Sequence, residues 1–202
     1  MNQKRMTVFQ LCVVAMAVGI NVAGGQLALV LRLPIYLDSI GTILTGALLG
    51  PWFGMLPNLL SGILMGMTTD IYSLYFAPAG MVMGFMNGLV WQKLIWKNRE
   101  SALNGKARLW LYALAVAAPG TVVSSVICAV VFGGITSSGS MVLVQLLART
   151  PLGMTASIFL VQIVTEYLDR ALSMMMVSGF LQALPGRMRD GLRCRPNLGR
   201  QR

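Results

Sequence analysis

The sequence contains no histidine, only six acidic residues and only three cysteines among 202 residues. Without histidine, the chain lacks the usual haem ligand, the commonest metal ligand and the imidazole general base. Cys12, Cys128 and Cys194 show neither a metal-like spacing nor a disulfide framework. The GxxxxGK[ST] phosphate loop is also missing, so the chain cannot by itself hydrolyse ATP in the P-loop manner.

Charged residues are scarce and apolar residues dominate. Charged residues make up 11% of the chain and apolar residues 56%, and the mean hydropathy is +0.71. A soluble domain of this length would not show that balance. We therefore predict an all-α, multi-pass membrane protein of the cytoplasmic membrane.

The formal net charge of +10 could indicate a nucleic-acid binder, but the basic residues are not spread over the chain. Of 16 basic residues, 13 lie in the first five residues, in 93–108 and in 187–202. Basic segments that flank apolar runs stay on the cytoplasmic side and contact anionic lipid. We expect both termini in the cytoplasm, an even number of spans and no nucleic-acid partner.

Six spans of a transmembrane helical bundle are predicted from apolar runs and from the breaks between them. Residues 1–186 would form this membrane domain, and 187–202 a basic cytoplasmic tail that we expect to be disordered. The first span is expected to be an uncleaved anchor. The short second and third spans would cross the bilayer only by thinning it or by sheltering inside the bundle. The predicted spans are 7–30, 37–49, 52–67, a run from after Pro78 to 96, 109–132 and 165–184.

The segment 133–164 is predicted to be an external connection, with short helices at 141–148 and 155–163. A second span in this region would place the arginine-rich tail outside, against the positive-inside rule. Glu166, Asp169 and Arg170 would then lie at the outer end of the last span. Glu166 and Asp169 share one helical face, where they either pair with Arg170 and Arg149 or contact a polar solute.

Polar residues inside the apolar runs are the best pointers to a site, because each costs free energy in lipid unless it faces the bundle or a cavity. Asn87 is the leading candidate, since Gly84 and Gly88 beside it would leave room for a ligand; the alternative is an interhelical hydrogen bond. The complete set is Asn21, Gln26, Asn58, Asn87 and Gln162, with Asp38 and Asp70 at span ends.

Aromatic and small residues form two further patterns. Tyr72, Tyr75 and Phe76 precede Pro78 in a predicted external connection, where they form an interfacial belt or stack on a planar substrate. Small residues recur every fourth position, as strips that pack the bundle or face a partner protein. The strips are Ala15, Gly19 and Ala23; Gly62 and Gly66; and Gly80, Gly84 and Gly88.

The chain contains, in this order, "LPIYLDSIGT", "ILTGALLG", "GPWFGMLPNLLSGILMG" and "FAPAGMVMGFMNGLVWQ", followed by "FGGITSSGS" and "EYLDRALSMMM". In this order of features most of the chain resembles the substrate-binding S components of energy-coupling-factor (ECF) transporters. The resemblance implies a six-helix bundle that is not an enzyme, needs no cofactor and captures a vitamin-like small molecule near the outer face. The loop at about 32–38 would act as a lid.

The resemblance also implies partners and contacts. Ala15, Gly19 and Ala23 would dock on a transmembrane coupling subunit that is driven by two ATPase subunits; glycine in the middle departs from the usual alanine. Substrate contacts would come from the lid, the 72–76 connection, Asn87 and the Glu166 to Arg170 group. The predicted substrate-binding residues are Asp38, Asp70, Tyr72, Tyr75, Asn87, Glu166, Asp169 and Arg170.

Two other functions remain open from the residues. A membrane enzyme acting on a lipid could use Glu166, Asp169 and Asp70 with a divalent ion, although carboxylate metal sites need several close acids. A non-catalytic signalling or assembly domain would use the small-residue strips alone. The mixture of aromatic, acidic and arginine residues suits a planar, polar solute, whether cationic or zwitterionic, without identifying it.

Overall fold

The described part of the chain contains seven α-helices and one π-helical turn, joined by loops, and no strand occurs in it. The computed structural model describes residues 7–95, 106–133, 139–149, 151 and 153–183. The elements are α1 (Val8–Val30), α2 (Ile40–Leu49), α3 (Pro51–Thr68), α4 (Ile71–Val90), the π-helical turn η1 (Trp91–Ile95), α6 (Lys106–Phe132), α7 (Ser140–Ala148) and α8 (Gly153–Ala183).

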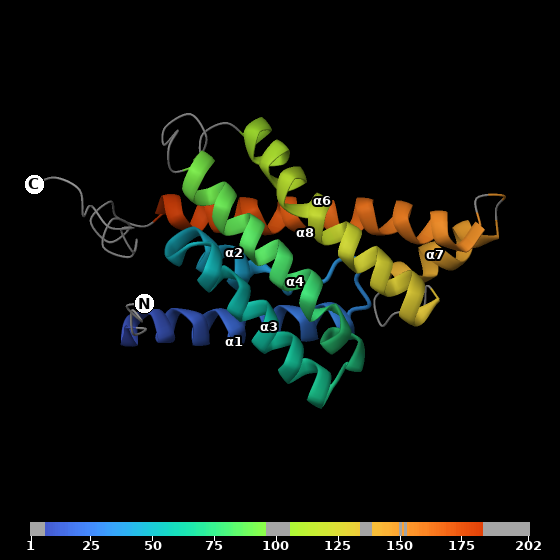
Figure 1. Ribbon diagram of the computed structural model, residues 1–202, viewed down its shortest axis with the longest axis horizontal. Coiled ribbons are helices and arrows are strands. Elements are labelled where there is room, and N and C mark those ends of the chain that lie inside the picture. Colours follow the sequence, from blue (N-terminus) through green and yellow to red (C-terminus); the bar gives the residue numbers. More distant parts are fainter. Residues whose placement is uncertain (1–6, 96–105, 134–138, 150, 152, 184–202) are drawn as a thin grey trace, which may run out of the picture.

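The helices form an elongated bundle in which α1 and α8 lie along the long axis and α3, α4 and α6 cross it obliquely (Figure 1). The start of α1 and the end of α8 lie at one end of the molecule, on the left of Figure 1, which we call the terminal end. The short helix α7 and the start of α8 lie at the opposite end. The most extensive contacts join α3 to α4 and α6 to α8.

Polar groups point inward and apolar groups outward along much of the bundle. In α8 the inward stripe contains Gln162, Glu166, Asp169 and Arg170, all buried. Large apolar side chains on the other faces of α8 are 42% or more exposed; they are Leu160, Ile163, Val164, Leu168, Leu172, Met176 and Phe180. This pattern suits a helix with lipid on one side and a polar interior on the other.

Three of the described helices are long and apolar enough to cross a membrane: Val8–Val30, Ile71–Ile95 and Arg108–Phe132. They overlap the first, fourth and fifth predicted spans, so the prediction of an all-helical, membrane-like chain is confirmed to that extent. Helix α2 is apolar but has only 10 residues.

The short helix α2 is enclosed by the bundle, as expected for a span too short to face lipid along its length. Every residue from Gly41 to Leu49 is buried. Its start is fixed by Asn21 of α1, whose Oδ1 accepts from the Gly41 amide and whose Nδ2 donates to Thr42 Oγ1, both at 2.8 Å. Gly50, with φ of 98°, makes the predicted break before Pro51.

Small residues on α3 and α4 bring these helices into close contact. A Cβ atom on Gly84 would meet the backbone of Gly54, and one on Gly54 would meet the Gly84 carbonyl. The strip on α1 behaves differently, because Ala15, Gly19 and Ala23 are exposed and a Cβ atom on Gly19 would meet nothing within 4 Å. The strips on α3 and α4 thus pack inside the bundle, and the strip on α1 faces outward.

The start of α4 differs from the prediction. The helix begins at Ile71 rather than after Pro78, so residues 72–76 form its first turns and not an external connection. Asp70 is the N-cap, and its side chain accepts from the Tyr72 amide. This cap starts the helix seven residues before Pro78, and a proline within a packed helix is tolerated where neighbouring groups satisfy the freed carbonyl.

The C-terminal third also differs. Helix α7 matches the short helix expected at 141–148, but the helix expected at 155–163 is the first part of α8, which continues unbroken to Ala183. Its 31 residues extend about 46 Å at 1.5 Å per residue. Ser157 and Thr165 bond to carbonyls of their own helix, so these polar residues do not interrupt it. Glu166 and Arg170 therefore lie near the middle of α8, not at its outer end.

Candidate functional site

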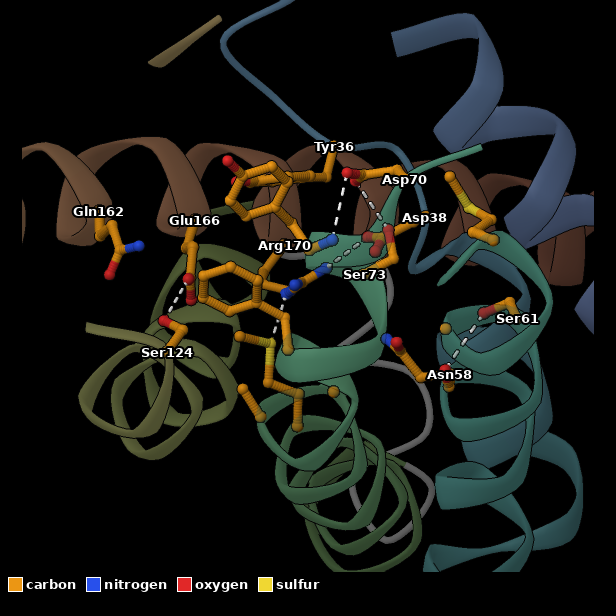
Figure 2. Close-up of a pocket in the computed structure, with 17 residues that line it drawn as sticks. Tyr36, Asp38, Asn58, Ser61, Asp70, Ser73, Ser124, Gln162, Glu166 and Arg170 are labelled. Carbon is orange, nitrogen blue, oxygen red and sulfur yellow. Dashed lines mark hydrogen bonds and ion pairs between the residues drawn. The ribbon is translucent and has the colours of Figure 1, made fainter. Parts of the chain in front are cut away.

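A partly enclosed cavity lies between the loop that follows α1 and helices α3, α4, α6 and α8 (Figure 2). It contains about 650 Å³ of empty space, counting its open mouth. Its polar lining comes from five separate segments. These lining residues are Tyr36, Asp38, Asn58, Ser61, Asp70, Tyr72, Ser73, Ser124, Gln162, Glu166 and Arg170.

Arg170 is the basic residue that lines this cavity, and its guanidinium contacts three neighbouring side chains. Its Nη1 lies 2.8 Å from Asp169 Oδ2 and 3.9 Å from Asp38 Oδ1, and its Nε faces Met83 Sδ at 2.8 Å. The side chain is only 6% exposed. Because a buried guanidinium is stable only when it is paired, these contacts hold Arg170 in one orientation against the cavity wall.

Asp169 connects this ion pair to the loop at 31–39. Its Oδ1 accepts from the Leu37 amide at 3.0 Å, and its Oδ2 lies 3.2 Å from Ser39 Oγ. Leu37 has a φ of 52°, in the left-handed region of backbone conformation that residues other than glycine rarely adopt. One carboxylate thus stabilises an unfavourable loop backbone and places Asp38 over the cavity.

Glu166 is oriented by two hydroxyl groups of α6. Thr121 Oγ1 donates to its Oε2 at 2.9 Å, and Ser124 Oγ donates to its Oε1. Figure 2 shows the bond between Ser124 and Glu166 at the edge of the cavity. Hydroxyl donors stabilise a carboxylate without adding positive charge, so Glu166 remains available to a cationic group.

Asp70 is held at another wall of the cavity by the start of α4. It accepts from the Tyr72 amide at 3.3 Å and from Ser73 Oγ at 3.0 Å. These bonds fix the position of a carboxylate whose main structural role is to cap the helix. Tyr72 and Phe76, which follow on α4, add aromatic surface to the same cavity, and both rings pack on Phe132 of α6.

Two acceptor oxygens in the cavity have no hydrogen-bond partner: Gln162 Oε1 and Asp38 Oδ1. Gln162 is only 7% exposed, so bulk water does not readily compensate it. Burial raises the pKa of Asp38 to about 6, although Arg170 acts in the opposite direction. A ligand that donates hydrogen bonds would satisfy both oxygens.

Five of the predicted substrate-binding residues share this cavity: Asp38, Asp70, Tyr72, Glu166 and Arg170. Asp169 lies directly behind Arg170 and supports it. Two predicted residues are placed elsewhere. Tyr75 is 48% exposed and packs on Phe132 without lining the cavity.

Asn87, the leading candidate from the sequence, also lies away from the cavity. It is buried between α2 and α4, and its Nδ2 donates to the Ile43 carbonyl at 3.1 Å. The small residues beside it make room for neighbouring helices and not for a ligand, since a Cβ atom on Gly88 would meet Pro51. Asn87 thus makes the interhelical hydrogen bond that is the alternative to a ligand contact.

Other lining residues lie outside the predicted substrate-binding set, and some of them had a signal in the sequence. Ser124 lies 42 residues before Glu166, and no spacing relates the two. Tyr36 had a signal, because it falls in the expected lid beside Asp38. Asn58 and Gln162 were among the polar residues noted in apolar runs, and both line the cavity. Asn21 and Gln26, from the same set, bond instead to Thr42 and Thr69.

Compared with protein-family models, curated proteins and solved structures, the chain matches none of them.

Proposed function

We propose that this chain is the substrate-binding membrane subunit of an ECF-type importer, which captures a vitamin-like small molecule from outside the cell. The observation that carries the proposal is the cavity itself. Its charged and hydroxyl groups are gathered inside a bundle whose outer surface is apolar. A polar cavity in such a protein is costly unless it serves a solute or an ion.

The proposed topology has six passes, formed by α1, α2, α3, α4, α6 and α8, with both termini in the cytoplasm. Basic residues support this orientation, because the sequence places them before α1, around the end of η1 and after α8. The loop at 31–39 and the turn between α3 and α4 would then face outward and admit the solute. Cysteine labelling tests this: in a cysteine-free background, Asp190→Cys should react only after the membrane is made permeable. Labelling of intact cells would refute the topology.

The exposed strip of Ala15, Gly19 and Ala23 supports docking on a transmembrane coupling subunit, with two ATPase subunits supplying the energy. These positions face away from the bundle and offer a flat surface to another helix. The loop at 31–39 lies where a lid over the cavity would lie, and Asp169 anchors it. Loading would be followed by reorientation of the bundle against the coupling subunit.

Replacing Ala15, Gly19 and Ala23 together by leucine should abolish complex formation and uptake while leaving ligand binding by the isolated chain intact. The matched control replaces Ala115 and Ala118, exposed on α6, by leucine. That control should leave both complex formation and uptake unchanged. Unaltered uptake by the α1 variant would contradict the docking surface. A chain that retains no small molecule in native mass spectrometry, and that supports no uptake, would contradict solute capture.

A further inference from the structure

The cavity has an excess of negative groups. Asp38, Asp70 and Glu166 line it and Asp169 lies immediately behind, whereas Arg170 is the one basic residue among the lining residues. With every group ionised, the formal charge of this set is −3. Such a set attracts a cation far more strongly than an anion, because the surrounding medium is less polar than water.

Arg170 cannot neutralise this excess. Its nearest carboxylate is that of Asp169, which lies outside the lining, and Asp38 is 3.9 Å away. Glu166 accepts hydrogen bonds from two neutral hydroxyl groups, and Asp70 accepts them from an amide and a hydroxyl group. Asp38 is therefore paired with Arg170 only at 3.9 Å, and the hydrogen bonds that orient Glu166 come from neutral hydroxyl groups.

An independent observation points to a hydrogen-bond donor in the same place. Gln162 Oε1 is unpartnered, its residue is 7% exposed, and it lies on α8 one turn before Glu166. Figure 2 shows the two side chains on the same side of α8, next to the cavity. A buried carbonyl acceptor beside a carboxylate is suited to a group with several N–H donors.

The remaining lining is aromatic and apolar. Tyr36, Tyr72 and Phe76 contribute rings, and Met65 and Met83 contribute thioethers. A smaller hollow, with about 300 Å³ of empty space counting its open mouth, shares Tyr36, Asp38 and Met65 with the cavity and extends toward α1. Aromatic faces attract cations and stack on planar groups. In the described part of the chain, no three acidic, cysteine or histidine side chains are grouped closely enough to hold one metal ion.

From these observations we infer that the cavity binds an organic cation: a planar or apolar body carrying a protonated amine, amidinium or guanidinium. The cationic group lies among Asp38, Glu166 and Gln162, and the body lies against the rings of Tyr36, Tyr72 and Phe76. This inference rests on the proposed capture function and specifies its substrate class.

The test uses three probes with the same ring and different charge: benzamidinium, benzamide and benzoate. Binding to the full chain in nanodiscs is measured by calorimetry at constant ionic strength, with Mg²⁺ and Ni²⁺ titrated separately. We expect benzamidinium to bind at least about tenfold more tightly than either isostere, because one charge-assisted hydrogen bond contributes that much. Equal or tighter binding of benzoate, benzamide or a metal ion would overturn the inference.

Variants of opposite sign sharpen the test. Glu166→Gln and Asp38→Asn should each weaken benzamidinium binding by about 10- to 100-fold. Gln162→Glu adds a carboxylate at the unpartnered oxygen and should strengthen binding by about tenfold. Asp190→Asn removes the same charge from the C-terminal tail, outside the described residues, and serves as the control. Weaker binding by Gln162→Glu, or an equal loss in Asp190→Asn, would contradict the site.

The results separate the substrate class from the proposed function. If native mass spectrometry finds a retained anion or a neutral molecule, capture stands and the cationic class fails. If benzamidinium binds as expected but uptake never depends on a coupling subunit, the class stands and the importer proposal fails. If no probe binds and nothing is retained, both fail.

Discussion

Replacement of Asp169 by asparagine tests the support of the site most directly. Asp169 is 1% exposed and receives hydrogen bonds from the Leu37 amide, Ser39 Oγ and Arg170 Nη1. Asparagine keeps the size of the side chain but removes its charge. The change therefore leaves the guanidinium of Arg170 buried without its nearest counter-charge.

The expected cost follows from these contacts. Breaking a buried ion pair by removing one partner costs roughly 3–5 kcal/mol. Because Asp38 remains 3.9 Å from Arg170 and can compensate in part, we expect about 3 kcal/mol of lost unfolding free energy. Ser39→Ala removes only a hydroxyl donor and should cost about 1 kcal/mol.

A double-mutant cycle separates the ion pair from general damage. Arg170→Gln alone should also cost about 3 kcal/mol, whereas the double variant should cost about 2 kcal/mol less than the sum, because no unpaired guanidinium remains. Reversible unfolding in mixed detergent micelles gives the free energies, and hydrogen exchange monitors residues 31–39. The loop should exchange faster in Asp169→Asn. A cost below 1 kcal/mol, or strictly additive variants, would refute the assigned role of Asp169.

Two further predictions concern pH and helix packing. Asp38 lies close to Asp169 and Arg170 of α8 and shares the cavity with Asp70 at the start of α4. Because burial raises the pKa of Asp38 to about 6, lowering the pH from 7 to 5 protonates this carboxylate. The loss of its charge should weaken benzamidinium binding about tenfold. Calorimetry across this range should give a flatter profile for Asp38→Asn, and binding that strengthens toward pH 5 would contradict the sign. Gly84→Ala should destabilise the bundle by about 1–3 kcal/mol, because its Cβ would meet the Gly54 backbone. The matched control Gly19→Ala meets nothing and should be neutral or slightly stabilising in thermal unfolding; equal effects of the two would contradict the packing of α3 on α4.

Local signals in the sequence were sufficient to predict the positions of the first three helices. The apolar runs at 7–30, 37–49 and 52–67 correspond to α1, α2 and α3, and the glycine and proline at 50 and 51 make the break between the last two. The predicted start of α4 after Pro78 is wrong, because the helix is capped by Asp70, eight residues earlier, and continues through the proline. The predicted last span, 165–184, covers only the second part of α8, because a bilayer-spanning length of about 20 residues does not set the length of a helix that continues past it.

Composition and the order of apolar and basic segments determined, without any structure, that the chain is helical, suited to a membrane and polar at a few interior positions. Such properties depend on local hydropathy and on the cost of polar groups in lipid. The tertiary structure alone decided which of those polar groups share a space. Asn87 donates to the Ile43 carbonyl of a neighbouring helix, whereas Ser124, Gln162 and Glu166 line one cavity together with Asp38. That outcome depends on how each helix is rotated and packed, which no spacing along the chain encodes.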